Sequence, residues 1–141
     1  MKKLISNVLA LTAMMVGLTI TLEAAPAQKM CPLMIEDEID VEEFLVYRVK
    51  VFVCCGTCKK MWASNPDYFA VVCQEQAPQL KAVASKEIKP MTQKFCPVYT
   101  DTRVHPGNPF IEHDGKKIYF CKTRAKSRFE SNPEKYLENI K

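Results

Sequence analysis

The seven cysteines of this chain are the residues whose type and spacing most clearly indicate chemistry. In three of them the pattern is Cys-x22-Cys-x3-Cys, formed by Cys31, Cys54 and Cys58. Thiolates are soft ligands, which prefer Cu(I) or Zn²⁺ to Mg²⁺ or Ca²⁺. Cys58 falls in the first turn of an expected helix, where the helix dipole favours thiolate over thiol. We therefore expect the three sulfurs to converge on one transition-metal ion, copper or zinc.

Copper and zinc differ in the number of ligands that they require. Cu(I) accepts three thiolates, whereas a structural Zn²⁺ requires a fourth ligand, for which Cys55 and Cys73 are candidates. Disulfide bonding stays open as an alternative for the same cysteines, because an exported chain meets an oxidising compartment. Seven is an odd number, so at least one thiol would remain unpaired within the chain.

The chain also repeats itself. The segment Phe52-Val53-Cys54-Cys55-Gly56-Thr57-Cys58-Lys59 is matched 67 positions later by Tyr119-Phe120-Cys121-Lys122-Thr123-Arg124-Ala125-Lys126. Self-similarity at a fixed offset indicates one small unit used twice. Because Ala125 stands where the first copy has Cys58, we expect the first copy to hold the metal and the second to fold without it. Cys96 and Cys121 would then form a disulfide or a mixed site with His105 or His113.

Each copy is expected to contain a Cys-Pro knuckle, a β-hairpin and one or two short helices. The fold class is therefore α+β, built from two small repeated modules. In the second copy Asp114-Gly115 is a strong signal for a two-residue hairpin turn; in the first, residues 44–47 and 49–53 are the strands. Helices are expected at 57–63 and 123–130. Further helices should start at Asn65-Pro66 and Asn132-Pro133, with Asn as cap and Pro in the first turn.

A set of motifs in the second copy resembles a known family. The motifs are Cys96-Pro97-Val98, Gly115-Lys116-Lys117-Ile118-Tyr119-Phe120-Cys121, and Phe129 followed by Asn132-Pro133-Glu134-Lys135-Tyr136-Leu137. They resemble the YHS domain and its relative the TRASH domain, small modules linked to heavy-metal handling. Residues 31–72 resemble a more divergent member, through Cys31-Pro32, Phe52-Val53-Cys54-Cys55, Cys58, Trp62 and Asn65-Pro66. The resemblance implies a metal-binding role for Cys31, Cys54 and Cys58.

The expected domain organisation has four parts. Residues 1–27 are predicted to be a signal peptide, with two lysines, an apolar run and small residues before the cleavage site. Residues 28–73 form the first module, 74–92 a linker with one helical turn, and 93–141 the second, degenerate module. We therefore expect export to the periplasm or outside the cell. An uncleaved signal would be the one contact with a membrane.

Composition and motifs argue against some classes of function. A net charge of +4 is too small to argue for nucleic-acid binding, and no Ser-His-Asp set, carboxylate pair or phosphate loop indicates an enzyme. We expect an exported soft-metal-binding protein that buffers, delivers or senses its ion, with a protein partner if it delivers. One alternative is a thioredoxin-like oxidoreductase using Cys55-Gly56-Thr57-Cys58, because a Cys-x-x-Cys that opens a helix after a strand is typical of that class. The other is a non-metal interaction module that uses the acidic first copy and basic second copy as its surface.

Overall fold

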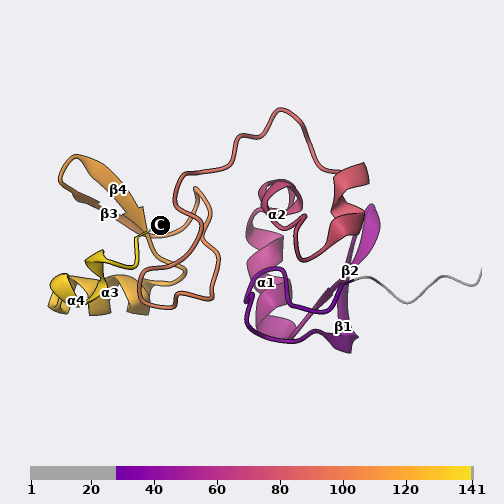
Figure 1. Ribbon diagram of the computed structural model, residues 1–141, viewed down its shortest axis with the longest axis horizontal. Coiled ribbons are helices and arrows are strands. Elements are labelled where there is room, and N and C mark those ends of the chain that lie inside the picture. Colours follow the sequence, from indigo (N-terminus) through magenta and orange to yellow (C-terminus); the bar gives the residue numbers. More distant parts are fainter. Residues whose placement is uncertain (1–27, 141) are drawn as a thin grey trace, which may run out of the picture.

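The computed structural model describes residues 28–140, so the predicted signal peptide lies outside the described residues. This part of the chain folds into two lobes of mixed helix and strand (Figure 1). We call residues 28–84 the first lobe and 93–140 the second; residues 85–92 connect them. Between them the described residues form two antiparallel hairpins and four α-helices, which confirms the α+β class. No helix among them has the length and apolarity needed to cross a membrane.

The first lobe consists of one hairpin and the helices that follow it. Its elements are β1 (Asp40–Tyr47), β2 (Val49–Val53), α1 (Gly56–Ser64), α2 (Pro66–Val72) and the 3-10 helix η1 (Pro78–Ala82). Strand alternation turns Val51 and Val53 into the core. Asn65 caps α2 as predicted: its side chain accepts a hydrogen bond from the Tyr68 amide, and Pro66 occupies the first turn.

The second lobe has a similar order of elements: β3 (Phe110–His113), β4 (Lys116–Tyr119), α3 (Thr123–Ser131) and α4 (Glu134–Leu137). The predicted turn is confirmed, since Asp114 and Gly115 have φ of 50° and 72°, the two positive values that a type I′ hairpin turn requires. The predicted cap at Asn132 is wrong. Asn132 instead ends α3, its amide donating to the Phe129 carbonyl, and α4 has no side-chain cap.

Each lobe encloses its own apolar core. Phe69 and Trp62 lie in the first core, and Phe129 lies in the second. A fourth ring, Tyr136, is half-buried and stacks on Phe129. The segment predicted as a linker also contributes, because Ala77 and Leu80 beside and within η1 are fully buried in the first core. The single helical turn predicted there corresponds to η1.

A segment of the second lobe, residues 101–105, runs along the loop of the first lobe that follows Cys31. The Arg103 amide donates to the Leu33 carbonyl at 2.9 Å, and the Ile35 amide donates to the Asp101 carbonyl at 3.0 Å. The Arg103 side chain continues the contact, with its Nε 2.7 Å from the Pro32 carbonyl oxygen. None of the ion pairs formed within residues 28–140 joins the lobes. Hydrogen bonds and packing therefore hold the contact together.

Candidate metal centre

Three sulfurs from a loop, the end of a hairpin and a helix meet in the first lobe. The Sγ atoms of Cys31, Cys54 and Cys58 all lie within 4.8 Å of one another. Cys58 Sγ is 3.7 Å from Cys31 Sγ and 3.5 Å from Cys54 Sγ. Three planar ligands with bonds of about 2.3 Å would be about 4.0 Å apart, and tetrahedral ligands about 3.8 Å apart. The cluster is therefore close to the geometry that one ion requires.

Local structure explains why the three residues converge. Cys54 follows the last residue of β2, and two residues later the chain enters α1 at Gly56. Cys58 lies in the first turn of α1, on the same face as Trp62 four residues on, and both are buried. Cys31 reaches the same point from a tight loop, closed by a 2.7 Å hydrogen bond from its own amide to the Asp37 carbonyl.

The electrostatics of the cluster leave it short of positive charge. A hydrogen bond with the Cys58 thiol, helped by the backbone amides of Met34, Leu33 and Cys54, lowers the pKa of Cys31 to about 5. The pKa of Cys58 is raised, mainly because its proton is held by Cys31, and burial raises the pKa of Cys54. One thiolate therefore forms readily, while the other two thiols keep their protons. A bound cation would remove the cost of ionising the two buried thiols, because it would take the place of their protons.

Cys55, the candidate fourth ligand, lies beside the cluster but outside the group of three mutually close sulfurs. Its Sγ is 3.7 Å from Cys54 Sγ and 3.9 Å from Cys58 Sγ. Hydrogen bonding from the Cys58 amide at the start of α1 lowers its pKa. Cys54 and Cys55 are both half-buried, whereas Cys31 and Cys58 are fully buried. The cluster is therefore accessible from the side of Cys54 and Cys55.

Cys73 lies outside the group of three mutually close sulfurs. Its thiol is fully buried and donates to the Pro32 carbonyl at 3.2 Å. Burial raises its pKa to about 12, so it stays protonated at neutral pH. The structure therefore places Cys73 in the first core and not among the mutually close sulfurs, although the sequence made it a candidate fourth ligand.

The second lobe has only part of such a site. A hydrogen bond with Cys121 lowers the pKa of Cys96 to about 6, and Ala125 occupies the first turn of α3 with no exposed surface. His105 is taken up elsewhere: its Nε2 lies 3.0 Å from Ser64 Oγ in the first lobe, and its ring packs edge-on against Phe69. Within residues 28–140 the Cys31 cluster is the one group of three or more potential His, Cys, Asp or Glu ligands. All seven cysteines are free thiols.

Two residues near the site had no signal in the sequence. The Sδ of Met34 lies 4.0 Å from Cys54 Sγ; a lone methionine in a loop has the same pattern as a core residue. Arg103 is 5% exposed, and its guanidinium binds the carbonyl of Pro32, next to Cys31, and the side chain of Gln76. The two Arg103 contacts join residues 71 and 27 positions apart, which no local spacing reveals.

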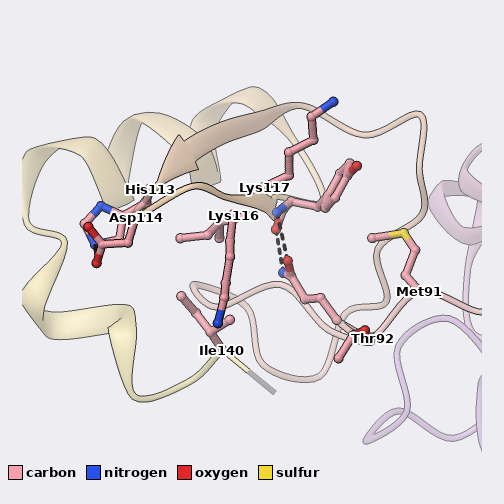
Figure 2. Close-up of a pocket in the computed structure, with 10 residues that line it drawn as sticks. Met91, Thr92, His113, Asp114, Lys116, Lys117 and Ile140 are labelled. Carbon is pink, nitrogen blue, oxygen red and sulfur yellow. Dashed lines mark hydrogen bonds and ion pairs between the residues drawn. The ribbon is translucent and has the colours of Figure 1, made fainter.

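A separate cavity of about 830 Å³ lies beside the β3–β4 hairpin of the second lobe and the end of the connecting segment (Figure 2). Met91, His113, Lys116 and Ile140 are among the residues that line it, and no cysteine is. The dashed lines in Figure 2 mark the two hydrogen bonds between the Gln93 side chain and the backbone of Tyr119. The cavity therefore belongs to a region distinct from the thiol cluster.

No protein-family model, curated protein or solved structure gives a significant match to the chain.

Proposed function

We propose that this protein binds one soft transition-metal ion, copper or zinc, through the thiolates of Cys31, Cys54 and Cys58. The observation that carries the proposal is the convergence of these three sulfurs within 4.8 Å. The ion would supply the positive charge that lets all three thiols ionise in a buried place. The protein residues do the rest: Cys31 and Cys58 anchor the ion in the interior, and half-buried Cys54 offers a route for its exchange.

We further propose that the two lobes are tandem modules of the YHS/TRASH type, the second having lost its metal. Equivalent hydrogen bonds in the two lobes support this. In the first, the amides of Cys31 and Ile39 donate to Asp37 and Lys29; in the second, those of Cys96 and Val104 donate to Thr102 and Lys94. Each member of the second set stands 65 positions after its counterpart.

The side chains of two glutamines agree with the same pairing. Gln28 binds the backbone amide and carbonyl of Phe52, and Gln93 binds those of Tyr119. Each glutamine thereby ties the segment that leads into its lobe to the second strand of the hairpin. This similarity of detail is expected of two copies of one unit, and it favours a family whose role is metal handling.

The biological setting of the proposal is export. The basic, apolar and small-residue pattern of residues 1–27 supports a signal peptide, and the protein would then buffer, deliver or sense its ion in the periplasm or outside the cell. No catalytic group is assigned to it. Delivery would require a partner that presents its own thiolates to the exposed side of the cluster, at Cys54 and Cys55.

Metal analysis of the purified mature protein tests the proposal. Protein kept reduced and loaded with excess Cu(I) or Zn²⁺ should retain one ion per chain after desalting. Cys58→Ser should lose that ion, and the matched variant Cys121→Ser in the second lobe should keep it. Retention of the ion by Cys58→Ser, or two ions in the native sequence, would show that the site is wrongly placed.

A second candidate function is thiol–disulfide exchange by Cys55 and Cys58. Their sulfurs are 3.9 Å apart at the start of α1, and the pKa of Cys55 is lowered, as in a redox-active Cys-x-x-Cys motif. The surrounding fold argues against it. Strands paired in the described residues are all antiparallel, whereas a thioredoxin-like motif lies in a βαβ unit. Insulin reduction that depends on both cysteines would favour this function over metal binding.

A further inference from the structure

A methionine thioether lies next to the three thiols. Met34 Sδ is 4.0 Å from Cys54 Sγ, and the Met34 side chain is half-buried against the first core. Tetrahedral ligands with bonds of about 2.3 Å lie about 3.8 Å apart, so these two sulfurs have the separation of two ligands on one ion. We propose that Met34 is a fourth ligand of the metal site and that its thioether makes the site select Cu(I) over Zn²⁺. This inference rests on the metal-binding function proposed above.

The backbone around Met34 is held from two sides. Within its own loop, the Met34 carbonyl accepts a 3.0 Å hydrogen bond from the Asp37 amide. From the second lobe, Thr102 forms a β-bridge with Met34, and the neighbouring residues Leu33 and Ile35 bond to the same segment. The thioether is thus presented by a fixed loop. Less conformational freedom is lost when it binds an ion than if the loop were free.

The donor set determines which metal is favoured. Thiolate and thioether sulfurs are soft and suit Cu(I), whereas Zn²⁺ takes its ligands from Cys, His, Asp and Glu. The mutually close ligand group contains three sulfurs and no imidazole or carboxylate. A neutral thioether beside the cluster adds affinity for Cu(I) without adding the charge that Zn²⁺ prefers. Cys55 is the competing donor, and it would favour Zn²⁺ by completing four thiolates.

The second lobe provides an internal comparison. Its corresponding loop has the same closing bonds, Cys96 amide to Thr102 and Thr102 amide to Tyr99, so Tyr99 stands where Met34 does. The Tyr99 hydroxyl binds Arg128 at 3.0 Å, and Lys122 lies over its ring at 4.2 Å. The lobe that has alanine in place of Cys58 therefore lacks the thioether as well. The two sulfurs are present together in one lobe and absent together from the other.

The experiment compares Cu(I) and Zn²⁺ affinities, measured by competition with chromophoric chelators, in the native sequence and three variants. Met34→Leu removes the sulfur while keeping an apolar side chain of similar volume. Met61→Leu changes another half-buried methionine of the same core and is the matched control. Cys55→Ser removes the competing donor. Selenium-edge X-ray absorption of selenomethionine-labelled, Cu(I)-loaded protein is the second measurement, because it needs no variant to fold.

We expect Met34→Leu to weaken Cu(I) binding by at least about tenfold while changing Zn²⁺ affinity little. Met61→Leu should leave Cu(I) affinity unchanged, Cys55→Ser should weaken Cu(I) binding less than Met34→Leu does, and selenium should show a copper neighbour at about 2.4 Å that Met34→Leu abolishes. Unchanged Cu(I) affinity in Met34→Leu, equal losses for both metals, or no copper near selenium would overturn the role of Met34. If the native sequence binds neither metal, or Cys58→Ser binds both normally, the proposed function itself fails.

Discussion

The protonation states of the three cluster thiols predict how strongly metal affinity depends on pH. The pKa of Cys31 is lowered to about 5, so this residue carries no proton between pH 6 and pH 8. The pKa values of Cys54 and Cys58 are raised above their ordinary value, so both remain thiols over the same range. Binding of an ion by three thiolates must therefore release two protons, one from each of these residues.

The size of the change in metal affinity with pH follows from the number of protons released. Each released proton makes binding more favourable by about 1.4 kcal/mol per pH unit, so affinity should rise about a hundredfold per unit and about ten-thousandfold from pH 6 to pH 8. Affinity must rise with pH, because a higher pH favours the deprotonated ligands. The Met34 thioether does not titrate, so Met34→Leu should shift the affinity without changing the slope.

The assay is competition with a chelator of known pH dependence, measured at half-unit steps under reducing conditions. Cys54→Ser should lower the slope from about two protons to about one, because only Cys58 then has a proton to lose. Cys121→Ser, in the second lobe, should keep the slope at two. A slope near three would mean that Cys31 is an ordinary thiol, and a slope near zero would mean that thiols are not the ligands.

Three further outcomes are expected. Arg103→Gln should lower the free energy of unfolding by about 2 kcal/mol in urea titrations, since buried hydrogen bonds from a charged donor are lost, whereas exposed Arg124→Gln should leave it unchanged; equal effects would refute the role of Arg103. Cys73→Ala should keep one ion per chain, and loss of the ion would make Cys73 a ligand. Ala125→Cys should add a second ion, measured by elemental analysis, because it restores the third thiol beside Cys96 and Cys121; a stoichiometry that stays at one would show that the second lobe lacks more than this sulfur.

Much of the local structure followed from the sequence because its signals are local. Asp114-Gly115 determines its turn through positive φ values that few residues tolerate, and Asn65-Pro66 determines the start of α2 through one capping bond and one fixed φ. Asn132-Pro133 has the same pattern and does not cap. There the chain forms only a four-residue helix, which begins after Pro133. The same dipeptide therefore caps a helix in one lobe and only ends one in the other.

The site, like the local structure, was predicted from the sequence only in part. The spacing of Cys31, Cys54 and Cys58 indicated a ligand set, and the structure brings their sulfurs together. Met34 and Arg103 were not predicted, because their importance arises from tertiary contacts. Met34 becomes a candidate ligand only when the fold brings Cys54 next to it. Arg103 becomes important only when the two lobes pack against each other. Charge composition was no guide to that packing, since the acidic and basic halves meet through hydrogen bonds, and no ion pair within residues 28–140 joins them.

The contact between residues 101–105 and the Cys31 loop has a consequence for biosynthesis. Arg103 is made 71 residues after Pro32, the residue whose carbonyl it holds. A nascent chain therefore presents all three cysteine ligands well before the segment that fixes one of their loops. During that interval the Cys31 loop is held only by bonds within the first lobe, such as the one from the Cys31 amide to the Asp37 carbonyl. The proposed metal site would therefore reach its final form only after residues 101–105 have been made and have paired with the loop that carries Cys31.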